Sequence, residues 1–185
     1  MTEAQTQKKP FPHFRTLNAD EIEVRVALIS EKGAQLLLYK DARCDMNLLD
    51  EVCGPMGWKR EHSRDNANCT VYIYHEGLCE WVGKEDTGTE SNTEAQKGLA
   101  SDSFKRACVN WGIGRELYTA PFIWIPAAAM DIKVSEFNGK KRYKTFDEFE
   151  VQKIAYDENR RITGVAIRNA KTKKLVYCFP AKEKA

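Results

Sequence analysis

Apolar residues fall on every second position between residues 21 and 28, which is the period of a strand with one buried face. A helical period follows over 42–53, and Gly54 and Pro55 end it. Later apolar runs are short and separated by turn-forming residues, which is typical of further strands. In chain order, the pattern predicts strands at 35–39, 57–63, 69–75 and 78–84, then a long helix at 93–111.

The long helix has a clear apolar face. Thr93 and Gln96 form a capping box at its start, and Gly112 follows its end. The residues expected in the core are Ala100, Phe104, Ala107, Cys108 and Trp111.

The remaining residues predict a β-meander. Asn138-Gly139 is a strong signal for a two-residue hairpin turn, and strands are expected at 151–156, 164–168 and 175–179. The fold class is therefore α+β, with a ββαβββα core in which an antiparallel sheet packs on the long helix, plus a C-terminal β-meander. The expected organisation is a flexible N-terminal tail at 1–13, a core domain at 14–130 and a basic β-meander extension of the same domain at 131–185.

Charge is distributed unevenly along the chain. The 185 residues carry a net charge of +2, which excludes both a strongly basic histone-like binder and an acidic disordered chain. Residues 1–132 hold 15 basic and 20 acidic side chains, whereas residues 133–185 hold 14 basic and 7 acidic ones. This asymmetry suggests a surface directed at an anion, although a solvated lysine-rich surface gives the same pattern.

The cysteines and the N-terminus indicate a cytosolic protein. None of the six cysteines forms a CxxC pair, so a zinc site is not expected. The start of the chain lacks the apolar core of a signal peptide, and no apolar run reaches about 18 residues. We therefore expect reduced thiols, no membrane association and no metal or other cofactor.

Two groups of cations are candidates for binding an anion. On the long helix, Lys105 and Arg106 lie near the small residues Gly98 and Ser101, which would let a phosphate backbone approach. The alternative is a surface ion pair between Asp102 and Arg106. In the second group, within residues 133–146, cations alternate with aromatic residues. This arrangement suits contact with a nucleic-acid backbone together with base stacking. The alternative is a charged hairpin that keeps a sheet edge soluble. The members of the second group are Lys140, Lys141, Arg142 and Lys144, with Phe137, Tyr143 and Phe146.

The loop at 86–91 precedes the long helix, and helix N-termini bind anions. Its two carboxylates argue against a phosphate there and favour a structural role. A nuclease reading would use an acidic cluster around Lys84 to hold two metals, but its spacing fits no established motif. That cluster consists of Glu76, Glu80, Glu85 and Asp86. No GxSxG or P-loop motif is present, so we do not expect an enzyme.

Several stretches resemble the Rad52 superfamily of single-strand annealing proteins, above all its phage and prophage branch. The specific ones are DTGTESN from Asp86 and ASDSFKRACVNWGIGRELY from Ala100. Weaker supporting stretches are EIEVRV from Glu21, LYKDAR from Leu38 and LLDEVCGPMGW from Leu48. Together they cover residues 20–125.

This resemblance implies a subunit that assembles into a ring or filament. A basic groove round the assembly would hold single-stranded DNA by its backbone and leave the bases exposed for pairing with a complementary strand, without ATP, metal or cofactor. The implied role is homologous recombination and double-strand break repair in the cytoplasm of a bacterial host, with a single-strand-binding protein or an exonuclease as further partners. From the residues alone, a shape-selective RNA-binding module and a metal-dependent nuclease stay open as alternatives.

The resemblance also implies particular DNA-binding residues. Lys105 and Arg106 match the adjacent basic pair on the family's groove helix, and Arg25 and Tyr39 match residues of its first two strands. Further candidates are Arg43, which falls in a basic neighbourhood, and Lys40 and Lys97, which could replace a cation that the family's eukaryotic members carry where this chain has Val109 and Asn110. Leu99 and Val109 are expected on the exposed helix face, where a subunit interface would bury them.

Overall fold

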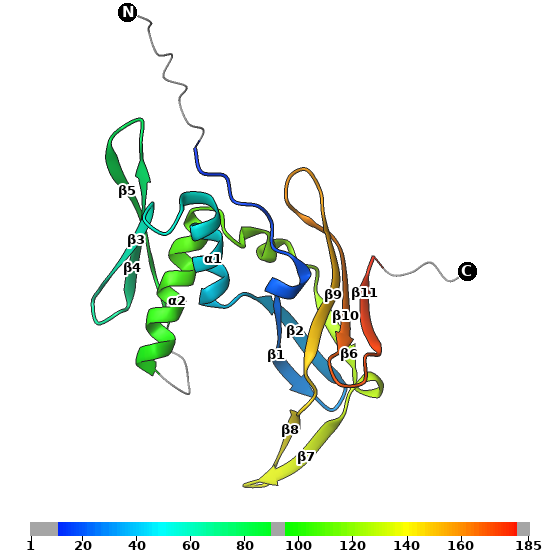
Figure 1. Cartoon of the computed structure of the whole chain (residues 1–185). Helices are drawn as coiled ribbons and strands as arrows, with labels where there is room; N and C mark the ends of the chain where they lie inside the picture. Colours follow the sequence, from blue (N-terminus) through cyan, green and yellow to red (C-terminus); the bar gives the residue numbers. More distant parts are fainter. Residues whose placement is uncertain (1–10, 90–94, 181–185) are drawn as a thin grey trace, which may run out of the picture. The chain divides into compact units, whose positions relative to one another are not determined.

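The computed structural model describes residues 11–89 and 95–180, with the side chains of 95–97 excepted (Figure 1). The chain folds into two compact units. The first consists of Met1–Arg15 and Ala42–Arg115, and the second of Thr16–Asp41 and Glu116–Ala185. Of the expected tail, residues 11–13 form neither helix nor strand, and the others lie outside the described residues.

The first unit packs two α-helices and a small antiparallel sheet. In chain order, its elements are α1 (Ala42–Cys53), β3 (Trp58–Ser63), β4 (Asn68–His75), β5 (Glu80–Thr87) and α2 (Ala95–Asn110). The three strands pair in the order β3-β4-β5, and α2 lies along β4 and β5 (Figure 1).

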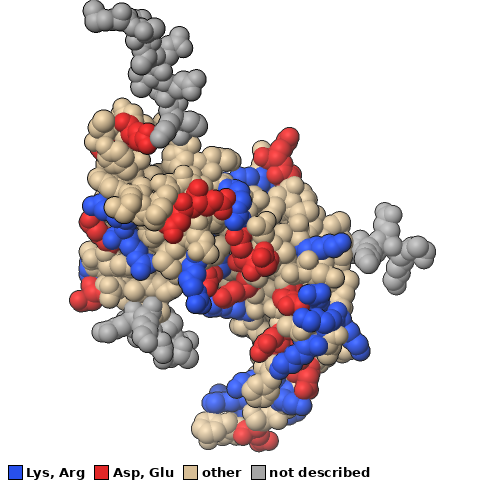
Figure 2. Space-filling view, viewed as in Figure 1, with Lys and Arg blue, Asp and Glu red and all other residues tan. Residues whose placement is uncertain are grey.

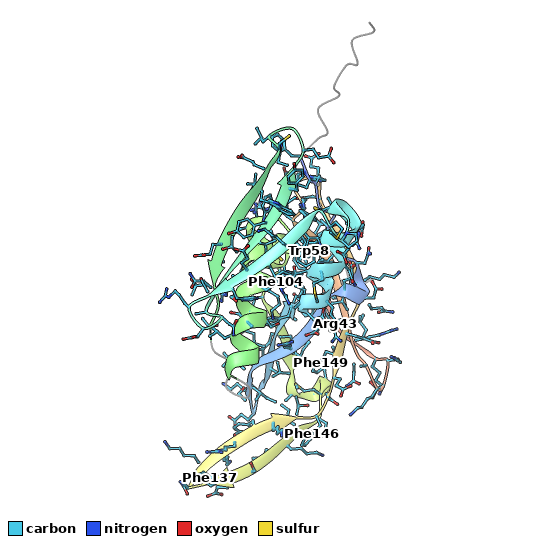
Figure 3. The ribbon with its side chains drawn as sticks, turned by 60° about the vertical axis from the view of Figure 1, so that its left-hand side comes forward. Arg43, Trp58, Phe104, Phe137, Phe146 and Phe149 are labelled. Atoms are coloured by element: carbon cyan, nitrogen blue, oxygen red, sulfur yellow. The ribbon has the colours of Figure 1, made fainter. Side chains whose placement is uncertain are left out.

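The core of this unit lies between α2 and β4. Phe104, Ala107 and Cys108 are fully buried, as the helical spacing predicts, and Val71 of β4 is fully buried as well. Trp58 of β3 stacks on Phe104 with ring centroids 6.1 Å apart (Figure 3). The other two expected core residues of α2, Ala100 and Trp111, are half-buried. The capping box of Thr93 with Gln96 lies outside the described residues.

The second unit is built on a six-stranded antiparallel sheet in the order β11-β10-β9-β1-β2-β6, and β7 and β8 form a separate two-stranded ribbon (Figure 1). Its strands are β1 (Glu23–Ser30), β2 (Gly33–Tyr39), β6 (Ile123–Pro126), β7 (Ile132–Phe137), β8 (Lys140–Thr145), β9 (Phe149–Tyr156), β10 (Ile162–Asn169) and β11 (Leu175–Phe179). Single 3-10 turns lie at Ala19–Glu21 (η1), Arg115–Thr119 (η2) and Ala127–Ala129 (η3).

The α+β class with antiparallel strands is confirmed, and the element order begins ββαβββα as expected. The single sheet that the sequence suggested is replaced by three. The β1–β2 hairpin pairs with β6 and β9, not with β3–β5. Strands from the expected core at 14–130 and the expected extension at 131–185 therefore share one sheet. No helix in the described part of the chain is long and apolar enough to cross a membrane.

A buried carboxylate ties the second unit together. Glu116 of η2 is 2% exposed, accepts a hydrogen bond from the backbone N–H of Leu17 over 2.8 Å, and pairs with Arg160 over 3.1 Å. The Tyr156 hydroxyl donates to the carbonyl of Leu17 over 2.8 Å. Burial, and then the negative charge of Glu116, raise the pKa of Tyr156, which keeps this hydroxyl a donor.

We expect Glu116→Ala to lower the free energy of unfolding by about 3 kcal/mol, because it removes the buried carboxylate that accepts from the Leu17 N–H and pairs with Arg160. Urea unfolding followed by circular dichroism measures the change. Glu148→Ala removes an exposed carboxylate from the same unit and should stay within about 0.5 kcal/mol of the parent. Equal stability of the two variants would show that the buried pair contributes nothing.

Candidate nucleic-acid interface

The adjacent cations of α2 are Lys105 and Arg106, and both are half-buried. The Nε of Arg106 donates to Oδ2 of Asp102, one helical turn earlier, over 2.9 Å. The ion pair that the sequence offered as an alternative is therefore present. It fixes the guanidinium on the helix surface.

Asp102 also binds the loop that precedes α2. Its Oδ2 accepts hydrogen bonds from the backbone N–H of Thr89 over 2.9 Å and from the Thr89 hydroxyl over 3.2 Å. Partial burial alone would raise the pKa of Asp102, but the Thr89 hydrogen bonds and the Arg106 charge outweigh it and leave the pKa below its ordinary value of 3.8. The carboxylate is thus held ionised between a loop and a cation.

Gly88 allows the loop to reach the helix. A Cβ at this position would stand 2.6 Å from the backbone N of Ser103 and 2.8 Å from the carbonyl O of Leu99. The loop is also fixed by the Gly88 N–H, which donates to Ala67 over 2.7 Å. The structural role favoured for this loop is therefore supported over residues 86–89, and its last two residues lie outside the described ones.

Two cations that the sequence analysis did not select lie at the C-terminal end of α2. The Nζ of Lys84 donates to the carbonyl of Asn110 over 2.9 Å and lies 4.5 Å from the ring centroid of Trp111. Arg115 donates to the carbonyls of Val109 and Asn110 over 2.8 Å and 3.0 Å. Both satisfy the last carbonyls of the helix and its negative dipole end. The only sequence feature that could have indicated this role is the position of Arg115, which shortly follows the glycines that end the helix, Gly112 and Gly114.

Two members of the acidic cluster considered for a nuclease accept hydrogen bonds from neutral side chains. Glu85 accepts from the side chains of Asn68 and Thr70, and Asp86 accepts from that of Asn110. Within residues 11–89 and 95–180, no group of three or more His, Cys, Asp or Glu side chains could hold a metal ion.

The candidates on the strands belong to the second unit. The guanidinium of Arg25 lies 5.1 Å from the ring centroid of Tyr39 and pairs with Glu23. Arg25 and Tyr39 are exposed, whereas Lys40 is only 5% exposed, so its ammonium is not offered to solvent.

The other two candidates of the first unit are Arg43 and Lys97. Arg43 is exposed on α1 (Figure 3). Lys97 lies in α2, and its side chain is outside the described ones. The helix residues Leu99 and Val109, expected on the exposed helix face, are half-buried within this chain.

The cations of the C-terminal group lie on the β7–β8 ribbon, which extends away from the six-stranded sheet (Figure 1). Figure 2 shows Lys and Arg side chains gathered along this ribbon, at the lower end of the view. The cationic members, Lys140, Lys141, Arg142 and Lys144, are all exposed. The ribbon is therefore the most basic exposed element that the sequence indicated.

Comparison with known proteins supports the resemblance over part of the chain. Residues 66–135 match the model of the Rad52/22 family of double-strand break repair proteins, which confirms the resemblance. The matched segment holds Lys84, Gly88 and α2 with its basic pair.

The chain is 37% identical over 93 residues to the single-stranded DNA-binding protein DdrA of Deinococcus radiodurans, covering 49% of this chain and 44% of that protein. It is 34% identical over 94 residues to DdrA of Deinococcus deserti, covering 50% and 46%. The chain thus spans less than half the length of these curated relatives. No solved structure matches.

The Asp102 carboxylate should make stability depend on pH. Because its pKa is lower in the folded chain, its contribution is fully present above about pH 4 and is lost as the pH falls through the folded-state value. Asp102→Asn keeps the acceptor for Thr89 but removes the charge. We expect the stability difference between parent and variant to be largest above about pH 4 and to shrink toward about pH 2.

Urea unfolding at several pH values measures this difference. Asp65→Asn, in an exposed turn, removes a carboxyl without this network and is the control. A constant difference between the Asp102 variant and the parent across the range would contradict the role of the charge.

Proposed function

We propose that this protein binds single-stranded DNA without sequence preference and anneals complementary strands in recombination and double-strand break repair. The observation that carries the proposal is the Lys105–Arg106 pair, held on α2 inside the segment that matches the Rad52/22 family model. The relatives that are named as single-stranded DNA-binding proteins support the same substrate.

Cations on a helix surface suit an annealing protein. Phosphates are identical along the strand, so binding through them is blind to sequence and leaves the base edges available for pairing. A guanidinium has five N–H donors, so the ion pair of Arg106 through Nε is compatible with a phosphate contact. Binding of this kind needs neither nucleotide hydrolysis nor a metal, and we propose that the protein is not an enzyme.

The remaining cations of the first unit extend this surface in the proposal. Lys84 and Arg115 bring positive charge to the end of α2, where this chain has Val109 and Asn110 instead of the third basic residue of the family's eukaryotic members. Arg43 and Lys97 are further phosphate ligands of the first unit. In the second unit, Arg25 and Tyr39 are proposed as DNA contacts in their own right. The proposed interface excludes Lys40 because this lysine is buried.

The proposed assembly is a ring or filament of identical subunits in the cytoplasm of a bacterial host, with a phage or prophage origin. Its proposed partners are two complementary single strands, and a single-strand-binding protein or an exonuclease that prepares them. A preference for duplex RNA over single-stranded DNA in a competition experiment would instead favour the shape-selective RNA-binding module.

Lys105→Ala and Arg106→Ala should each weaken binding to single-stranded DNA equally for different sequences. Each should also reduce the slope of log K against log salt by roughly 0.7 to 1, because each removes one phosphate contact. Fluorescence anisotropy with two labelled oligonucleotides of unrelated sequence measures both effects. Annealing of complementary labelled strands, without ATP or metal, should slow in parallel.

Two further variants sharpen this test. Lys59→Ala removes an exposed lysine that already pairs with Glu61 in the same unit, and it should leave the salt slope unchanged. Arg106→Lys keeps the charge while losing the hydrogen bond from Nε, so it should keep most of the slope. Unchanged binding by both alanine variants would rule out α2 as the DNA-binding surface.

A further inference from the structure

The β7–β8 ribbon together with Phe146, here called the arm, has two chemically different faces. Asn138 and Gly139 form its turn with positive φ angles of 50° and 69°, and the strands pair without a bulge. Residues directly opposite each other in an antiparallel pair share a face, so the register assigns every side chain. The basic face consists of Lys133, Ser135, Phe137, Lys140, Arg142 and Lys144. The apolar face consists of Ile132, Val134, Glu136, Lys141, Tyr143 and Thr145.

Charge is separated between these faces. The basic face carries four cations and no carboxylate of either strand. On the apolar face, Glu136 stands directly opposite Lys141, so that face is neutral. Lys133 at the base of the arm pairs with Asp131 over 2.8 Å. The positive charge that remains lies on β8, at Lys140, Arg142 and Lys144.

The two faces also differ in exposure. Every residue of the basic face is exposed, whereas Ile132, Tyr143 and Thr145 of the apolar face are half-buried. The Tyr143 hydroxyl donates to the carboxylate of Glu31, in the turn between β1 and β2, over 3.4 Å. The apolar face is therefore turned toward the body of the second unit, and the basic face is turned toward solvent.

Aromatic rings lie among the cations of the basic face. The guanidinium of Arg142 lies 4.4 Å from the ring centroid of Phe137, which is 55% exposed. The Nζ of Lys144 lies 4.7 Å from that of Phe146, which is 61% exposed. Phe137 is at the tip of the arm and Phe146 at its base (Figure 3). Large exposed rings beside cations are the combination with which proteins bind unpaired bases and their phosphates.

We infer that the basic face of the arm is a second binding strip for single-stranded nucleic acid, separate from the cations of α2. Lys140, Arg142 and Lys144 recur every second residue, about 6.8 Å apart along the strand, and contact successive parts of one sugar–phosphate backbone. Phe137 and Phe146 stack with bases, and Lys141 takes no part. The inference rests on the proposed function. β8 lies beyond the family match, which ends at residue 135.

Single alanine variants of Lys140, Lys141, Arg142 and Lys144 test the strip. We expect the salt slope for binding single-stranded DNA to fall by roughly 0.7 in three of them and to stay unchanged in Lys141→Ala. The Lys140, Arg142 and Lys144 triple variant should lose about 2 from the slope. Lys141→Ala is a matched control because it removes the same charge from the same strand but from the other face.

Replacing an aromatic ring should change the affinity but not the salt slope, unlike replacing a cation. Phe137→Ala should weaken binding roughly fivefold or more and leave the salt slope unchanged, because stacking releases no counterions. Phe137→Tyr keeps the ring and should bind like the parent. Circular dichroism checks that each exposed substitution leaves the fold intact.

The outcomes separate this inference from the proposed function. If the parent protein does not bind single-stranded DNA, the proposed function fails. If the parent binds and Lys105→Ala weakens binding while the triple arm variant behaves like the parent, only the arm inference is overturned, and an acidic protein becomes the better candidate occupant. Equal losses for Lys141→Ala and its neighbours would indicate diffuse attraction and overturn the face assignment.

Discussion

The geometry of the basic helix depends on one close backbone approach at Gly88. Any side chain there would collide with the backbone of α2, because a Cβ would lie 2.6 Å from the nitrogen of Ser103. Only when the loop lies this near can Thr89 donate two hydrogen bonds to Asp102, which in turn holds Arg106. Because Gly88 has no Cβ, the loop can reach Asp102. Asp102 in turn holds the guanidinium of Arg106, one helical turn further along α2.

The same helix shows why net charge is a poor guide to what this protein binds. Residues 1–132 are acidic overall, yet the carboxylates of Glu85 and Asp86 accept hydrogen bonds from neutral side chains. The cations, by contrast, bind groups of α2. Arg106 pairs with Asp102, and Lys84 and Arg115 donate hydrogen bonds to the last carbonyls of the helix. Local fields at these positions are set by such contacts and fall off within a Debye length, so the sum over the chain says little about them.

Local periodicity predicted the elements well and their partners less well. The strands at 21–28 and 69–75, the long helix and the Asn138-Gly139 turn all follow from patterns within a few residues, and the structure has them. The pairing of β1 with β9 joins Glu23 to Glu150, and no local pattern carries that information. The helix-end cations were missed for the same reason, since Lys84 meets Asn110 only after the helix has packed on its sheet. Half-burial of Leu99 and Val109 likewise depends on packing within the folded chain.

Two groups of cations held in different ways would give the proposed annealing a physical basis. Contacts to phosphate weaken together as salt rises, because each releases counterions, whereas stacking on Phe137 and Phe146 does not depend on salt in this way. In the proposed function, each group holds single-stranded DNA by its backbone at low salt and leaves base edges free. At high salt the aromatic contribution inferred for the arm would become the larger share of what remains. The relative contribution of arm and helix is therefore a function of ionic strength, and a comparison of their variants at one salt concentration would misjudge it.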